Sequence, residues 1–354
     1  MKLTIAICAH NAEHRIAGPL KALAAQTLPS EHNWDILLID NGSTDRTLEA
    51  VLTLNDDLRL PLRVVHESQL GLTFARMRAA KEAIGTWLAF CDDDNLPAPD
   101  WVEHVLEFAV AHPHAGVFGG KIMPLVERAD LRPHDFTDEL FGLLGCSDRG
   151  DGTMLLESGF PVGAGMVIRR DLLQTICRDI GIYSVGRQGT SLTGCEDSEI
   201  GIMARRLGWE LWYCGNQRVG HVMPPHRVRH EYRDALAAQA IRSAAWLQVL
   251  RAGKVPRSRT ALRLRAIPDL LRSAQYFLAA WSPLRLHRKS ARLDHWRRFY
   301  AAKASGWFCL TKDLDRVSQI LAELQRRSKT RPATRVAAEL EEPFELNRRT
   351  TVPA

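Results

Sequence analysis

The 354-residue chain contains no run of about 18 uncharged apolar residues, so the sequence predicts no transmembrane helix. Its first residues, MKLTIAICAHNAEHR, lack a charged segment that leads into a long apolar stretch, and no signal peptide is expected. The seven cysteines are scattered and form no CxxC pair, which favours reduced thiols in a cytoplasm over a zinc site. These absences favour a cytoplasmic globular protein.

Two phosphate-binding signatures are also absent. No GxGxxG follows the first apolar run, as a dinucleotide-binding fold would require, and the chain has no GxxxxGK[ST] loop. Gly163-Ala-Gly165 is too short to replace either signature and indicates instead a close approach between backbone segments. If a phosphate group binds to this protein, a metal ion or basic side chains must hold it.

Basic charge is concentrated in one segment. The formal net charge is +6, yet residues 251–303 hold fourteen Lys or Arg and two Asp, a local balance of +12 that leaves −6 elsewhere. Within this segment, PDLLRSAQYFLAAW has apolar residues at helical intervals. Such a helix either packs on the rest of the protein or lies on an anionic membrane surface, at the inner face of the cell membrane.

The first 120 residues alternate between short apolar runs and segments with helical spacing. The runs are bounded by turn-forming or polar residues and predict strands at Leu3–Cys8, Asp35–Asp40, Leu62–His66, Trp87–Cys91 and Gly116–Gly119. This order predicts an α/β fold with a mostly parallel central sheet flanked by helices. In such sheets, ligands bind beyond the carboxyl ends of the strands.

Polar residues follow three of the predicted strands where each strand ends: Ala9-His10-Asn11, Asp40-Asn41-Gly42 and Asp92-Asp93-Asp94. The three consecutive carboxylates repel one another and are costly to bury unless a cation or water neutralises them. Both a divalent metal ion and a solvated turn would account for them. The coincidence of the clusters at one edge of the sheet indicates a site.

The second half of the chain is less regular at first. Residues 121–160 are rich in Pro and Gly, and Pro161–Arg170 predicts a strand with a glycine kink. A glycine-rich loop from Gly186 to Gly194 then precedes an acidic helix start with Glu196, Asp197 and Glu199. Acidic residues are favoured in a first helical turn, but the preceding loop is not explained by that preference.

Five motifs occur in one order along the chain: TIAICAHN, LLIDNGSTDRT, GLTFARMRAAKEAIGTWLAFCDDDN, GAGMVIRRDLL and GCEDSEIG. In this order the chain resembles the family 2 glycosyltransferases with the GT-A fold, over roughly residues 1–230. The resemblance implies a catalytic domain over residues 1–230. A helical basic extension over residues 231–325 and a polar, disordered tail over residues 326–354 would follow.

The resemblance also implies an activity. A sugar would pass, with inversion, from a nucleotide-diphospho-sugar to a hydroxyl acceptor in glycan, polysaccharide or glycolipid synthesis, with a UDP-sugar as the preferred donor. The acceptor would be a glycan, a lipid-linked molecule or a small molecule. In the family's pattern Asp40 contacts the base of the nucleotide, and Ala9, Asn11 and Asp93 border the same donor site.

The family's DxD motif corresponds to Asp92 and Asp94, which implies an Mg²⁺ or Mn²⁺ ion that bridges the donor diphosphate. As alternate residues of an extended chain, the two carboxylates would point to one ligand. A solvated turn would leave the other strand-end clusters unexplained.

The later motifs supply the remaining site residues. Asp197 stands at the position of the catalytic base, and Glu196 beside it is the second predicted catalytic residue. One base with direct displacement gives inversion. His221 matches a histidine that approaches the metal or the diphosphate, although His226 and His230 compete with it for this role. Arg227 would pair with a phosphate oxygen.

Two other classes of protein are alternatives. An aspartyl-phosphate phosphotransferase also places DxD after an apolar strand, but those enzymes usually have Thr or Val where this chain has Leu96, and their motif follows the first strand. A non-catalytic carbohydrate or nucleic-acid binder would suit the basic segment, but it would not need Asp197 or the three aspartates. No nucleic-acid partner is therefore expected.

Overall fold

The computed structural model describes residues 2–28, 33–126, 138–187, 192, 194–254, 258–280 and 290–329. Part of the predicted irregular segment, most of the predicted glycine-rich loop after residue 187 and the tail from residue 330 lie outside these residues. No helix among the described residues has the length and apolar content needed to cross a membrane.

The described strands form one nine-stranded mixed sheet in the order β3-β2-β1-β4-β8-β6-β9-β5, with β7 paired to β9. Its first half is parallel, as the sequence predicts, and consists of β1 (Leu3–Ala9), β2 (Trp34–Asp40), β3 (Leu62–His66) and β4 (Trp87–Phe90). The second half joins through β8 (Val167–Arg169), which runs antiparallel to both β4 and β6.

The longest strands are β6 (Ala115–Val126) and β9 (Glu210–Met223), which pair in parallel. β6 extends well beyond the predicted Gly116–Gly119 because its pairing resumes after an irregularity between Gly120 and Lys121. A side chain at Gly120 would collide with the backbone carbonyl of Gln217. Two short strands, β5 (Asn95–Pro97) and β7 (Thr153–Leu155), pair antiparallel with β9.

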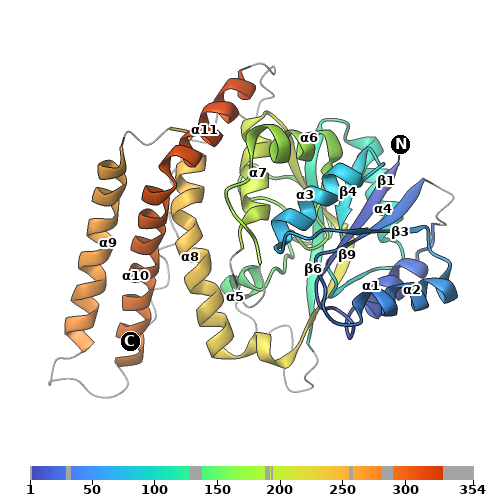
Figure 1. The fold of residues 1–354 in the computed structure, drawn as a ribbon, viewed down its shortest axis with the longest axis horizontal. Helices are drawn as coiled ribbons and strands as arrows, with labels where there is room; N and C mark the ends of the chain where they lie inside the picture. Colours follow the sequence, from blue (N-terminus) through green and yellow to red (C-terminus); the bar gives the residue numbers. More distant parts are fainter. Residues whose placement is uncertain are drawn as a thin grey trace.

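Helices cover both faces of the sheet (Figure 1). Side chains of β1 alternate between the two faces: Ile5 and Ile7 enter one buried cluster and Ala6 enters the other. The first cluster packs against α1 (Ala17–Ala24), α2 (Thr47–Leu58) and α4 (Trp101–Ala111). The second packs against α3 (Leu72–Glu82), α6 (Arg170–Gln174) with the π-helical turn η3 (Thr175–Ile180), and α7 (Glu196–Arg206). A short helix, α5 (Asp138–Leu143), follows β6.

The C-terminal region is helical, as the sequence predicts. It consists of α8 (His230–Ala252), α9 (Arg259–Ala280), α10 (Ser290–Lys312) and α11 (Leu314–Ser328), and Gly253 ends α8 with a φ of 61°. Figure 1 shows α10 between α8 and α9, with α9 on the outside. α11 returns to the sheet-containing half, where Val317, Ile320 and Leu321 enter the same buried cluster as α6 and α7. The helices therefore share a core with the sheet, and the first residues of the predicted tail belong to α11.

Candidate active site

The carboxyl ends of β1, β2 and β4 meet at one edge of the sheet, so the three polar clusters come together as predicted. Ala9 pairs in register with Asp40, and the Asn41 N–H donates to the Ala9 carbonyl at 2.8 Å. Asn11, with a φ of 48°, accepts a hydrogen bond from the Thr44 N–H at 2.8 Å. An ion pair at 2.6 Å between Arg15 and Asp93 then joins the loop after β1 to the acidic cluster after β4.

The predicted nucleotide side of this edge includes Asp40, the last residue of β2. Asp40 is buried; it accepts a hydrogen bond from the Ser43 N–H at 3.2 Å and contacts His66 Nδ1 at 3.1 Å. The contact with Ser43 is the local turn expected of an aspartate at a strand end. The side chain of Ala9 packs in the core, so only its backbone borders the edge.

Asn41, which the sequence analysis placed in the cluster without a role, organises the neighbouring loop. Its amide group donates to the carbonyls of Glu67 and Gln69 at 3.1 and 2.7 Å. Its oxygen accepts a hydrogen bond from the Gly71 N–H at 2.8 Å, at the start of α3. The end of β2 is therefore fixed to the segment that positions α3.

The three aspartates lie in a turn. The Asn95 N–H donates to the Asp92 carbonyl at 3.0 Å, while the Asn95 side chain accepts from the Asp92 N–H at 3.0 Å and donates to Asp94 Oδ1 at 3.2 Å. The prediction assumed an extended chain in which Asp92 and Asp94 point the same way. The assumption of an extended chain was wrong, because the bonds of Asn95 fold the segment into a turn.

Each carboxylate has its own basic partner. Asp93 pairs with Arg15, Asp94 lies 2.7 Å from Arg227 and 3.3 Å from His221 Nε2, and Asp92 lies 3.9 Å from Arg76. Burial, reinforced by the charge of Asp94, raises the pKa of Asp93 to about 6. Burial acts in the same direction on Asp94, but hydrogen bonds and charges from His221 and Arg227 outweigh it and hold the pKa of Asp94 well below its ordinary value.

These contacts distinguish the three candidate histidines, of which His221 lies near the end of β9 and the other two follow it. His221 is buried at the acidic turn beside partly buried Arg227, and its Nδ1 atom has no partner among the described residues. His226 lies instead beside Tyr232, with 5.8 Å between ring centres. The side chain of His230 lies outside the described residues. Of the two histidines whose side chains are described, only His221 contacts the acidic turn.

The acidic turn offers one open carboxylate to a hard divalent cation. In the part of the chain that the structure describes, no three His, Cys, Asp or Glu side chains are grouped to hold a metal ion. Mg²⁺ and Mn²⁺ sites at phosphates need only one or two protein carboxylates, because water and substrate oxygens complete the shell. Asp92 has the most exposed of the three side chains, at 28%, with its basic neighbour at 3.9 Å, so its carboxylate is open to a cation. Asp94 would have to exchange one of its present contacts.

Arg76 of α3 is a central residue that the sequence analysis missed. Its side chain is 3% exposed, lies over the Phe90 ring and contacts the Glu196 carboxylate at 3.1 Å. A Cβ atom on Gly163 would lie only 2.7 Å from this guanidinium. The sequence predicted a close backbone approach here, but the group that approaches Gly163 is the side chain of Arg76.

The acidic start of α7 divides its three carboxylates between two surroundings. Glu196 and Glu199 are buried, and burial raises the pKa of both although Arg76 and hydrogen bonds oppose it. Glu199 accepts hydrogen bonds from the N–H groups of Tyr183 and Ser184 at 2.6 and 2.9 Å, so it holds the segment before the predicted loop.

Asp197 is the one of the three that keeps partial exposure. Its carboxylate accepts hydrogen bonds from the Gly163 N–H at 3.0 Å and the Ser198 N–H at 2.6 Å. These bonds fix the direction of the carboxylate. Because Arg76 contacts Glu196 and Asp92, the helix start that carries Asp197 lies beside the acidic turn.

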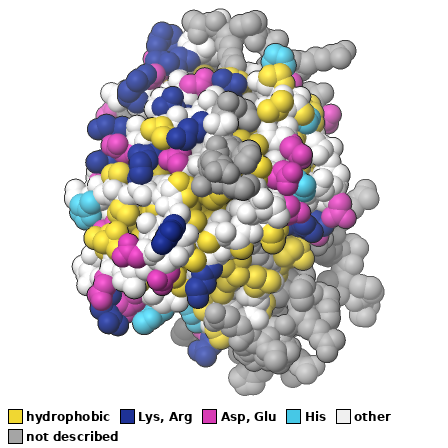
Figure 2. All heavy atoms as spheres, turned by 90° about the vertical axis from the view of Figure 1, so that its right-hand side faces the viewer, with side chains coloured by type: hydrophobic (Ala, Val, Ile, Leu, Met, Phe, Trp, Pro, Cys, Tyr) yellow, Lys and Arg dark blue, Asp and Glu magenta, His cyan; other side chains and the backbone are white. Residues whose placement is uncertain are grey.

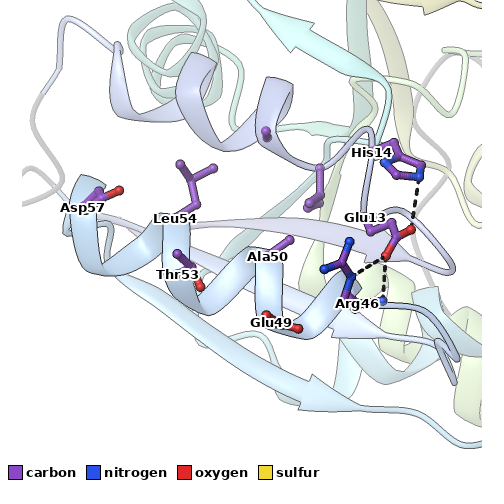
Figure 3. A pocket seen from close by; sticks show the side chains of 10 residues that line it. Glu13, His14, Arg46, Glu49, Ala50, Thr53, Leu54 and Asp57 are labelled. Atoms are coloured by element: carbon purple, nitrogen blue, oxygen red, sulfur yellow. Dashed lines mark hydrogen bonds and ion pairs between the residues drawn. The ribbon is translucent and has the colours of Figure 1, made fainter.

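A separate cavity lies between α1 and α2 (Figure 3). It has a volume of about 360 Å³, and Glu13 at its wall contacts His14 at 3.1 Å and Arg46 at 3.6 Å. None of the predicted site residues lines it. The chemistry of the strand edge is therefore distinct from this cavity.

Comparison with known proteins gives the family. The family model for Glycosyl transferase family 2 matches residues 4–177. The chain is 24% identical over 247 residues to the glucosyl-dolichyl phosphate glucuronosyltransferase of Haloferax volcanii, which covers 66% of this chain and 72% of that protein. It is 32% identical over 109 residues to the Escherichia coli UDP-Glc:alpha-D-GlcNAc-diphosphoundecaprenol beta-1,3-glucosyltransferase WfgD, which covers 31% of this chain and 40% of that protein.

Among solved structures, the chain resembles the mannosyltransferase PcManGT of Pyrobaculum calidifontis in complex with GDP-Man and Mn²⁺. The TM-score is 0.52 at 18% sequence identity, and the match covers 86% of this chain and 85% of that one. At this identity the likeness concerns the fold, and the predicted GT-A type is confirmed.

Proposed function

Because the chain belongs to glycosyltransferase family 2 through residues 4–177, we propose that it transfers a sugar from a nucleotide-diphospho-sugar to a hydroxyl acceptor with inversion at the anomeric carbon. One observation carries this proposal. Buried Arg76 contacts both Glu196 and Asp92, so it holds the start of α7 beside the acidic turn. A donor bound at the strand edge would thus have a carboxylate, that of Asp197, close to its reacting carbon.

Asp197 is the general base in this proposal. The acceptor oxygen attacks the anomeric carbon, the bond from that carbon to the phosphate oxygen breaks, and the electron pair leaves with the nucleoside diphosphate. The proton of the acceptor hydroxyl passes to Asp197, whose carboxylate is fixed by Gly163 and Ser198. Glu196 is buried against Arg76, so its role is to orient that side chain rather than to touch the acceptor.

The donor occupies the edge formed by β1, β2 and β4. Asp40, Asn11 and the backbone of Ala9 face the nucleoside, a UDP-sugar being the preferred donor. Asp92 and Asp94 would hold Mg²⁺ or Mn²⁺, with His221, Arg227 and Asp93 beside them. When bound, the ion would neutralise charge on the diphosphate leaving group.

A lipid-linked glycan is the acceptor that we propose. The names of the two relatives above include a dolichyl phosphate and a diphosphoundecaprenol, both of which are polyprenyl carriers. A carrier of this kind stays in a membrane, which is consistent with the basic charge of residues 251–303. We therefore also propose peripheral contact with an anionic membrane.

Titration of the full chain with UDP and GDP, with and without Mn²⁺, tests the donor site. We expect UDP to bind more tightly with Mn²⁺ than without it, and more tightly than GDP. The Asp92→Asn variant should lose most of this dependence and keep its melting temperature, because Asp92 is partly exposed and has a single distant ion pair.

The matched variant is Asp94→Asn, which should lose the same Mn²⁺ dependence and also melt earlier, since Asp94 is buried against Arg227 and His221. Undiminished Mn²⁺ dependence in both variants would exclude the acidic turn as the metal site. A lack of sugar transfer to any polyprenyl-linked acceptor, with transfer to a soluble glycan, would refute the proposed acceptor class.

A further inference from the structure

α9 is apolar on two opposite faces. Its inner face packs on α10, with Leu262 and Ala266 buried and Asp269 paired with Lys303 at 3.2 Å. Its outer face carries Leu264, Ile267 and Leu271, whose exposed fractions are 59%, 43% and 60%. Residues spaced by three and four positions lie on one side of a helix, so these three form a continuous stripe, here called the α9 stripe.

The α9 stripe is unusual for the outermost helix of a protein. A helix with one side in water normally has a polar outer face. Adjacent Leu270 is exposed as well, at 42%, so one helix presents four large apolar side chains. Single exposed residues elsewhere, such as Val110 on α4, need no explanation, but a continuous stripe marks a contact surface.

The exposed charges that α9 itself carries have one sign, and of its arginines Arg259, at the start of the helix, pairs with exposed Asp315 of α11 at 3.1 Å. All the basic residues of α9 are exposed, and they are Arg259, Arg263, Arg265 and Arg272. Asp269, the one acidic residue of α9, is buried. At the opposite end of the molecule, by contrast, acidic and basic side chains are interspersed (Figure 2). The partner of the α9 stripe should therefore be apolar and negatively charged.

Two of these arginines are held in place by α10. Arg265 lies over the ring of Trp307 and Arg272 over that of Tyr300, each at 5.4 Å from the ring centre. These contacts fix the two guanidinium groups along the border between α9 and α10, beside the α9 stripe. Little side-chain entropy would then be lost when they meet an anionic surface.

We propose that the outer face of α9 binds the surface of an anionic lipid bilayer. Leu264, Ile267 and Leu271 would enter the boundary between headgroups and acyl chains, and the arginines would meet lipid phosphates. This proposal rests on the proposed function in one respect, because it places the enzyme on the membrane that holds a polyprenyl-linked acceptor. It names the helix face responsible, which the charge count of the whole segment does not.

Co-sedimentation of the full chain with vesicles tests this proposal without any sugar donor. We expect binding to phosphatidylcholine vesicles that contain phosphatidylglycerol, little binding to phosphatidylcholine alone, and a decrease as salt is raised. Leu264→Gln combined with Leu271→Gln should lower the partition coefficient at least tenfold, because both side chains would lose an apolar contact. Arg263→Gln combined with Arg272→Gln should lower the partition coefficient about fivefold for each arginine replaced.

The chain offers matched controls on other helices. Leu48 and Leu52 on α2 are exposed by 41% and 49%, four positions apart, and their double Gln variant should bind vesicles like the wild type. The control for the arginine variant is Lys21→Gln combined with Lys81→Gln, because both lysines are exposed, and it should also bind vesicles like the wild type. Circular dichroism and UDP binding confirm that every variant is folded.

Several outcomes would overturn the inference. Equal binding to both kinds of vesicle, no binding, or equal losses in the α2 control would exclude this face as a lipid surface. The wild type could instead form dimers that the combined Leu264→Gln and Leu271→Gln variant does not form. If vesicle binding were then unchanged in this variant, the α9 stripe would be a contact surface for a second copy of the chain. Failure of sugar transfer with intact vesicle binding would refute the proposed function alone.

Discussion

The guanidinium of Arg76 lies 3.1 Å from the carboxylate of Glu196, and both side chains are almost completely buried. The same guanidinium is 3.9 Å from Asp92, so a single cation on α3 joins the acidic turn to the start of α7. Glycine at position 163 makes this possible, because any side chain there would occupy the place of the guanidinium. The relative position of the proposed donor and base therefore depends on a residue that contacts neither substrate.

The first prediction concerns this ion pair. Arg76→Met should lower the free energy of unfolding by about 3–5 kcal/mol, because Glu196 would remain buried without its partner. Burial already raises the pKa of Glu196, and without Arg76 it would rise further. The folded variant then binds more protons than the unfolded chain, so its stability should decrease as pH rises above about 4.3 and recover below that value.

Urea unfolding at several pH values measures this effect. Arg178→Met is the matched control, because Arg178 also pairs with an aspartate but has a 76% exposed side chain, and it should change stability by no more than about 0.5 kcal/mol. The double variant Arg76→Met with Glu196→Gln should regain part of the lost stability. Similar losses for Arg76→Met and Arg178→Met would show that the buried pair has no special role.

The strands and the location of the site could be predicted from the sequence because both depend on local patterns. Apolar runs such as Leu62–His66 form strands over the predicted residues, and the polar residues that follow β1, β2 and β4 necessarily share one edge. The length of β6 could not be predicted, because its second half continues through Gly120 and Lys121 and is held by pairing with β9, which is distant in sequence.

The inner connections of the site were also beyond sequence analysis. Arginine on a helix is normally solvent-exposed, and the partner of Arg76 lies 120 positions away. One local signal was present, since Arg76 shares a helical stripe with Thr73 and Ala79, which are both buried. The turn at Asp92–Asp94 depends on side-chain bonds of Asn95, which no periodicity reveals.

The second prediction concerns α11. Val317, Ile320, Leu321 and Leu324 are buried in the cluster that also holds α6 and α7, and Arg316 donates to the carbonyl of Ile182 at 2.6 Å. Termination of the chain after Lys312 removes four apolar side chains from the core, each worth about 1.5–3 kcal/mol. The sum is comparable to the whole stability of a domain, so the truncated chain should not fold.

Termination after Lys329 is the matched control. The sequence of residues 330–354 is polar and predicts no packed structure, so the melting temperature of this chain should equal that of the full chain. Circular dichroism and thermal unfolding of the two truncated chains give the answer. A stable, cooperatively folded chain that ends at Lys312 would show that α11 is an appendage rather than part of the catalytic core.

The third prediction separates two carboxylates on the same helix. Asp197 is partly exposed and would receive the acceptor proton, so Asp197→Asn should reduce sugar transfer by about 10²–10⁴-fold. UDP and Mn²⁺ affinity should change little, because in the described part of the chain the carboxylate of Asp197 bonds to Gly163 and Ser198 and to none of the proposed donor-site residues. The melting temperature should also stay close to that of the wild type, since the amide oxygen still accepts one of the two backbone hydrogen bonds.

Glu199→Gln, two residues further along α7, provides the comparison. Glu199 is fully buried and accepts two backbone hydrogen bonds from Tyr183 and Ser184, so this variant should melt earlier while the folded enzyme retains most of its turnover. If the acidic residues served only to stabilise the start of α7, both variants would lose stability and neither would lose turnover. Turnover, UDP affinity and melting temperature of the two variants distinguish these cases, and normal turnover of Asp197→Asn would remove Asp197 from the mechanism.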